Sequence, residues 1–213
     1  MSKKSILRPL GAGLYLALFL LARTTGAQTP VAVPSTMTTL AGGLVPTAYT
    51  AGTTLCPGSS TVKASTGSGD NCPAIAATFG AGGRGGVAVD QFSNVFVADD
   101  VTKSVHMIDQ STGVLSLVAG LGSACGSSAG KLTSAGDGCL AAGQTVLSSP
   151  RGVGIDPYGN VLIADYGQSL IHIVCRSGSP LCTGGIPAPT AANPLQVQIG
   201  YMGIVGGCAG GSG

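Results

Sequence analysis

A sixteen-residue segment that occurs twice is the feature that most constrains the fold of this chain. Residues 84–99 read RGGVAVDQFSNVFVAD, and residues 150–165 read PRGVGIDPYGNVLIAD. From Asp90 onward the second copy follows the first at a constant offset of 66 residues, and the same offset relates His106 to His172. Self-similarity at a fixed spacing is typical of repeat architectures, in which each copy is one supersecondary unit. We therefore expect two copies of one structural unit.

Each copy is predicted to form four short strands. The expected strands cover residues 86–90, 95–98, 104–109 and 114–119 in the first copy, and residues 152–156, 161–164, 170–175 and about 198–205 in the second. Residues 95–98 and 161–164 are apolar on both faces, which indicates strands that are buried on both faces. The connections are too short and too rich in glycine for crossover helices, so we expect small antiparallel sheets packed between other sheets, as in propeller blades. A β-sandwich is the alternative, although it would show polar outer faces.

The second copy resembles the NHL repeat. It has the pattern Pro-x-Gly-Val-x-Ile-Asp-x-x-Gly-Asn-Val-x-Ile-Ala-Asp, followed by an Ile-His-x-Val strand and a Val-Gly-Gly ending. The first copy departs from this pattern where Ser93 replaces the turn glycine, and residues 37–42 resemble the end of a fourth strand more weakly. The resemblance implies an all-β partial β-propeller with two full four-stranded antiparallel blades and an N-terminal outer strand near residues 37–41. The long Gly-, Ser- and Cys-rich connections are similar to those of secreted bacterial members.

The first 27 residues are interpreted as a signal peptide. Basic residues precede an apolar run from Leu10 to Ala22, and the small residues Thr25-Gly26-Ala27 follow as a cleavage site. An apolar run of this length is shorter than the roughly 20 residues that span a bilayer. We therefore expect residues 28–213 to form one NHL-like domain that is secreted or periplasmic and has no membrane anchor.

Charge argues against nucleic acid as a partner. Without residues 1–27, six basic residues stand against eight aspartates and no glutamate, a net charge of −2. Nucleic-acid binding usually requires a clustered basic face that neutralises phosphates, and the sequence has no such cluster.

All seven cysteines lie after residue 27, where an oxidising compartment would let them pair. Six of them bracket three connections and are expected in disulfides, although the sequence leaves the connectivity open: Cys56 and Cys72, Cys125 and Cys139, Cys175 and Cys182. A disulfide that closes a loop of about 15 residues contributes roughly 3 kcal/mol in the chain-entropy model. Cys208 is left unpaired, because no counterpart of Cys139 follows it. We expect from this, and from the two-blade count, that further blades are missing from the chain.

The remaining polar candidates are interpreted as structural. Four aspartates that recur with the repeat are expected to cap turns through backbone N–H groups: Asp90, Asp99, Asp156 and Asp165. His106 and His172 are the candidates for a metal site, but catalytic zinc sites use about three protein ligands. The resemblance makes their position basic and solvent-facing, so we expect no metal and no cofactor. Residues 80–85 fit G-x-G-x-x-G, but a strand rather than a helix follows them.

The expected function is that of a binding or scaffolding module rather than an enzyme. Its loop-bearing face would meet a protein, glycan or cell-envelope partner. The alternative is a propeller-type lyase or lactonase that acts on a small molecule with a divalent metal. Such an enzyme needs several inward-facing His, Asp, Glu or Asn side chains at strand starts, and the sequence offers few. Spacing supports no Ser, His and Asp grouping, and we predict no catalytic residue.

Overall fold

The computed structural model describes residues 37–42, 49–80, 84–125, 135–180, 182 and 199–207. The chain divides into two units, residues 1–38 and residues 39–213, and the strands that the structure describes lie in the second. Of the first unit, only Met37 and Thr38 are described, and both are exposed. No helix in the described part of the chain is long and apolar enough to cross a membrane. The expected signal peptide at residues 1–27 and Cys208 lie outside the described residues.

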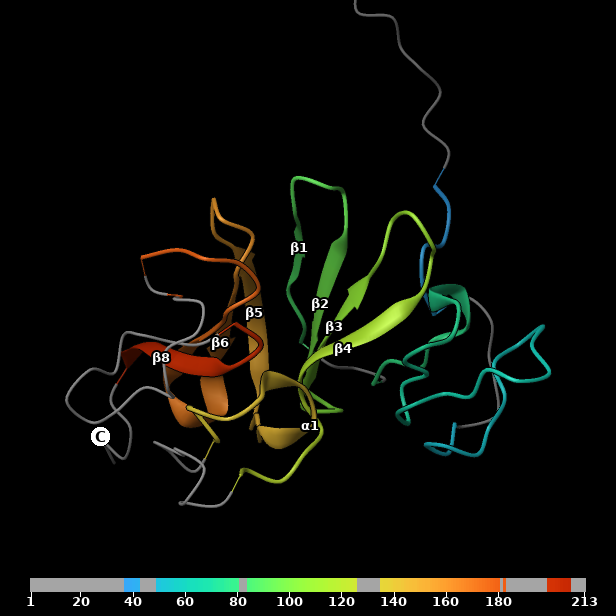
Figure 1. The fold of residues 1–213 in the computed structure, drawn as a ribbon, viewed down its shortest axis with the longest axis horizontal. Coiled ribbons are helices and arrows are strands. Elements are labelled where there is room, and N and C mark those ends of the chain that lie inside the picture. Colours follow the sequence, from blue (N-terminus) through green and yellow to red (C-terminus); the bar gives the residue numbers. More distant parts are fainter. Residues whose placement is uncertain are drawn as a thin grey trace, which may run out of the picture. The chain divides into compact units, whose positions relative to one another are not determined.

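The fold is all-β, with two four-stranded antiparallel sheets (Figure 1). The first sheet has the order β1 (Val87–Val89), β2 (Val95–Asp99), β3 (Ser104–Ile108) and β4 (Leu115–Gly120), and the second has the order β5 (Pro150–Ile155), β6 (Val161–Asp165), β7 (Leu170–Val174) and β8 (Met202–Gly207). Helical segments are short: η1 (Ala74–Ala76), α1 (Ala141–Gln144) and η3 (Tyr166–Gln168). The predicted strands are confirmed to within two residues, except that β8 begins four residues later than expected.

The two sheets share two irregularities of their outer strands as well as the same strand order. A β-bulge interrupts the outer strand pair directly before His106 and again directly before His172. The outer strands end at Gly120 and Gly207, which both have positive φ, 92° and 104°. A Cβ at these positions would lie 2.3 and 2.2 Å from a backbone oxygen of the turn that precedes the third strand. The glycine that ends each copy is therefore required by the backbone.

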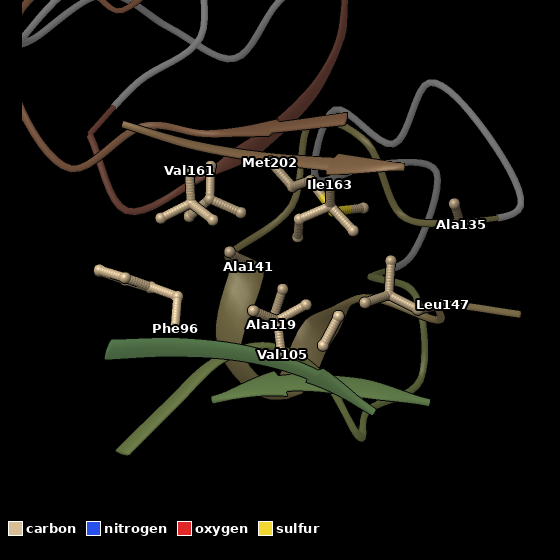
Figure 2. Close-up of a cluster of buried hydrophobic side chains, with 11 residues drawn as sticks. Phe96, Val105, Ala119, Ala135, Ala141, Leu147, Val161, Ile163 and Met202 are labelled. Carbon is tan, nitrogen blue, oxygen red and sulfur yellow. The ribbon is translucent and has the colours of Figure 1, made fainter. Parts of the chain in front are cut away.

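The main core lies between the two sheets and is built from unlike faces. Phe96, Ala98 and Val105 on the first sheet pack against Val161 and Ile163 on the second (Figure 2). Under the 66-residue offset, Val161 and Ile163 correspond to Val95 and Val97, which lie on the other side of the first sheet. We call the side with Val95 and Val161 the front face, and the side with Phe96 and Leu162 the back face. The back of the first sheet thus packs on the front of the second.

Disulfide-containing connections complete the packing on both front faces. Residues 121–149 lead into the second sheet and contribute Ala141 and Leu147 to the core between the sheets, as Figure 2 shows. Residues 49–80 lead into the first sheet, where Ala74 and Ala77 pack with Ile108 and Leu115. The first sheet is therefore covered on its back face and on the part of its front face nearest β3 and β4, as its two-sided apolar strands predict.

Two parts of the expected architecture differ from the structure. Residues 37–42 form no strand, so the predicted N-terminal outer strand is wrong; Gly42 N instead donates a hydrogen bond to Ala74 O at 3.1 Å. An outer strand needs a neighbouring sheet to pair with, and no described sheet is placed to receive it. The two described sheets also do not close into a ring, so the structure establishes the sheets but not a propeller.

Replacing Gly86 by alanine should loosen the contact between the sheets. A Cβ on Gly86 would lie 3.0 Å from Arg151 O and 3.1 Å from the Cα of Gly152, so β1 and β5 must move apart. Such overpacking costs about 1–3 kcal/mol. Gly154→Ala is the matched control, because nothing lies within 4 Å of a Cβ built there. Urea unfolding should show a lower midpoint for Gly86→Ala alone, and equal midpoints for both variants would contradict the close approach.

Candidate functional site

Each sheet carries one buried histidine that is paired with a buried aspartate. His106 Nδ1 lies 2.9 Å from Asp70 Oδ1, and His172 Nδ1 lies 2.8 Å from Asp137 Oδ1. All four side chains are at most 1% exposed. Each aspartate stands two residues before a disulfide cysteine, in the connection that covers the sheet. The expectation that both histidines face solvent is therefore wrong, because the two connections fold over the third strands.

The first of these pairs extends into a longer hydrogen-bonded chain. Ser104 Oγ lies 2.7 Å from His106 Nε2, and Thr66 Oγ1 donates to Asp70. Asp, His and Ser thus stand in the order found in serine hydrolases. Spacing gave no support for such a grouping, because Asp70 and His106 are 36 residues apart and on different elements.

Burial argues that this Ser, His and Asp grouping is structural. A nucleophile must be able to reach its substrate, whereas Ser104 and His106 are completely buried. The Ser104 hydroxyl also lies 2.6 Å from Thr102 Oγ1. In the second sheet Leu170 occupies the position of Ser104, and His172 Nε2 has no hydrogen-bond partner among the described residues. The histidine–aspartate pair is thus the repeated feature, and the serine is not.

Neither histidine belongs to a cluster of possible metal ligands in the part of the chain that the structure describes. Within the described residues, no group of three or more His, Cys, Asp or Glu side chains could hold a metal ion.

The aspartates Asp90 and Asp156 cap the first turn of each sheet. Asp90 Oδ1 accepts hydrogen bonds from the backbone N–H groups of Phe92 and Asn94, both at 2.9 Å. Asp156 Oδ1 accepts the equivalent bonds from Tyr158 and Asn160, both at 2.8 Å. These contacts are those of a turn cap.

Asp99 and Asp165 each hydrogen-bond two segments to the end of the second strand of their own sheet. Asp99 accepts from the backbone N–H of Val101 in the following turn and of Gly80 in the preceding connection. Asp165 accepts from Gly167 in the following turn and from Ser149 in the preceding connection. Each carboxylate therefore anchors the connection as well as the turn.

Three disulfides join the six expected cysteines, and the structure fixes the connectivity that the sequence left open: Cys56–Cys72, Cys125–Cys139 and Cys175–Cys182. Their Cα atoms are 5.1, 5.8 and 5.5 Å apart, within the usual range for disulfides. Three such bonds indicate that the chain folds in an oxidising compartment, such as the periplasm or the extracellular space.

The most exposed aromatic side chains of the first turns form a surface that sequence reasoning missed. Phe92 is 70% exposed and Tyr158 is 51% exposed, and they occupy the same position of the two copies. Two shallow hollows of about 150 and 250 Å³ lie beside these turns. We call this surface the twin-turn face; it is lined by Val89, Asp90, Gln91, Phe92, Ile155, Asp156, Pro157, Tyr158, Gly159, Arg176 and Ser177. An aromatic residue at the same turn position of both copies was the signal available in the sequence.

Arg176 joins the two sheets at the twin-turn face. Its guanidinium Nη1 lies 3.8 Å from Asp90 Oδ2, and its Cζ lies 5.0 Å from the centre of the Phe96 ring. Burial alone would raise the pKa of the Asp90 carboxyl, but hydrogen bonds from Asn94 and Phe92 and the charge of Arg176 outweigh it, so that pKa lies below its ordinary value. The partly exposed guanidinium of Arg176 is therefore held beside an Asp90 carboxylate that is itself almost buried.

Another hollow, of about 370 Å³, lies between the sheets on their outer side. Its lining is apolar except for Ser116 and Arg176 and includes Leu117, Val118 and Val174. No aspartate and no histidine is among its described lining residues.

Comparison with known proteins adds no assignment. No protein-family model matches the chain, and no curated protein matches it significantly.

Removing the carboxylate of Asp70 should destabilise the protein. Asp70→Ala would leave the Nδ1 of a fully buried histidine without its partner, and an unsatisfied buried polar group costs about 1–3 kcal/mol. Asp109→Ala is the control, because that carboxylate is exposed and bonds only to Ser111 and Thr112 of its own turn. Thermal unfolding should show a clearly larger loss of stability for Asp70→Ala than for Asp109→Ala. A larger loss for Asp109→Ala would refute the view that the Asp70–His106 pair holds the connection on the sheet.

Ser104 should not behave as an activated nucleophile. Because its side chain is buried, a fluorophosphonate probe should leave the native protein unlabelled, as judged by intact mass. Labelling that disappears in the Ser104→Ala variant would show instead that the Asp70, His106 and Ser104 chain is a catalytic site.

Proposed function

We propose that this chain is an exported, partial β-propeller of the NHL-repeat type that binds a protein partner through its twin-turn face. The observation that carries the proposal is the pair of exposed aromatic residues, Phe92 and Tyr158, at the same turn position of neighbouring sheets. In the proposal the two sheets are propeller blades. Residues 1–27 direct export, which agrees with the three disulfides.

The dimensions of the twin-turn face favour a macromolecular partner. Small-molecule sites are usually clefts of roughly 300–1,000 Å³, whereas the two hollows have volumes of about 150 and 250 Å³. Exposed aromatic residues and arginine are enriched in protein interfaces and in their energetic hot spots. Phe92, Tyr158 and Arg176 supply this combination on one face.

The alternative, a propeller-type lyase or lactonase with a divalent metal, finds less support. It requires open, inward-facing ligands. His106 and His172 are instead buried and bonded to aspartates. The Asp70, His106 and Ser104 chain would suit a different reaction class and is closed to solvent.

The double variant Phe92→Ser/Tyr158→Ser should lose partner binding without losing stability. A protein cross-linked to the wild-type chain in the extracellular fraction of the producing organism would be identified, purified and titrated by calorimetry. Two aromatic hot spots are worth at least 1.4 kcal/mol together, so the dissociation constant should rise at least about tenfold.

Tyr166→Ser is the matched control, because this tyrosine is 67% exposed but lies in η3, at the other end of β6. Its binding should equal that of the wild type. Unchanged binding by the double variant would refute the proposed face. Purified glycans are titrated in parallel, and glycan binding that only the double variant loses would reassign the partner to carbohydrate.

A further inference from the structure

The front face of the first sheet exposes side chains whose counterparts are covered in the second. Val87 and Val89 on β1 are 63% and 58% exposed. Their counterparts under the 66-residue offset, Val153 and Ile155 on β5, are partly buried and pack against the core between the sheets. The difference follows from what lies in front of each strand: β5 faces the back of the first sheet, and no described sheet faces β1 from that side.

The back face of the second sheet shows the complementary difference. Ala98 and Val105 on the first sheet are 1% and 0% exposed, because the second sheet covers them. Their counterparts on the second sheet, Ala164 and Ile171, are exposed, Ile171 by 45%. The positions that form the contact between the sheets thus occur a second time, and no described sheet covers them.

Glycine positions point to the same surface. Gly86 lets β1 approach β5, because a Cβ there would lie 3.0 Å from Arg151 O. Its counterpart Gly152 has no atom of another sheet within 4 Å of a Cβ, and Gly154 has none at all. The back face of the second sheet therefore has room for the close approach of another strand, as the first sheet has for β5.

The outer part of this back face is already occupied. Ile173 is completely buried in a cluster with Cys175 and Cys182, so the disulfide loop covers that part of β7. The surface that stays open runs from β5 across β6 to the start of β7. We call it the inner back strip, and it consists of Gly152, Gly154, Ala164 and Ile171. Its counterpart on the first sheet, the inner front strip, consists of Val87 and Val89.

We propose that a second copy of this chain docks its inner front strip on the inner back strip of the first copy. The contact would repeat the packing already present between the two sheets of one chain. A second copy of the chain carries the front strip that this packing requires. Because the two strips are unlike, the association is head to tail, and it continues to further copies or closes into a ring. It goes beyond the proposed partner binding and does not depend on it.

The test is the mass in solution of the full chain, recovered from an oxidising export compartment, by sedimentation velocity over a range of concentrations. The wild type should associate as its concentration rises. Ile171→Asp and Val89→Asp should each raise the apparent dissociation constant at least about tenfold. Val62→Asp is the control, because Val62 is 46% exposed but lies in the connection before the first sheet. Both test positions are exposed, and thermal midpoints verify that the variants fold.

Mixing the two variants separates this model from symmetric association. Ile171→Asp keeps an intact front strip, and Val89→Asp keeps an intact back strip, so an equimolar mixture should form a heterodimer that neither variant forms alone. A monomeric wild type at all concentrations would overturn the proposal. So would association that Val89→Asp leaves unchanged, which would indicate a symmetric back-to-back contact.

Discussion

The buried histidine–aspartate pair is the interaction on which the rest of the structure depends. The connections before each sheet are rich in Gly and Ser and bury mainly alanines, so apolar contacts alone hold them weakly. A charge-assisted hydrogen bond in a low-dielectric site is stronger than a neutral one, and the adjacent disulfide limits the freedom of the same segment. In the second copy, the segment anchored by Asp137 also carries Ala141 and Leu147 into the core between the sheets. Fastening the connection therefore also positions the packing of one sheet on the next.

The sheets were predictable because the sequence repeats and its strands are apolar on both faces. A two-sided apolar strand such as residues 95–98 has to be covered twice, and this leaves few arrangements for a chain without crossover helices. The start of β8 was harder to place, because the connection before it is long and carries the Cys175–Cys182 loop instead of a tight turn. In the first sheet, Asp109 caps a tight turn at the position that Cys175 occupies in the second.

The burial of the histidines is difficult to predict for a different reason. Their aspartate partners are non-local, and the resemblance implies a basic, exposed position. Yet residues 69–72 (Gly-Asp-Asn-Cys) and 136–139 (Gly-Asp-Gly-Cys) are similar, and the Asp that they share recurs together with the repeated His. Two ionisable residues that recur together within a repeat are candidates for direct contact, even when 36 residues separate them. The exposure of Phe92 and Tyr158 could not be predicted from the repeat, because it depends on where the neighbouring sheet lies.

The differences between the two copies help to separate the structural role of a residue from a chemical one. Both sheets keep the His–Asp pair, the bulge beside it and the glycine that ends the outer strand, although the first histidine bonds Ser104 and the second faces a position filled by Leu170. If the serine defined the function of this cluster, the second copy would have no reason to hold its histidine in the same place. It does hold it there, with Nδ1 bonded to an aspartate that lies two residues before a disulfide cysteine. The shared requirement is therefore attachment of the connection, and the hydrolase-like order in the first copy follows from a serine that satisfies the other ring nitrogen.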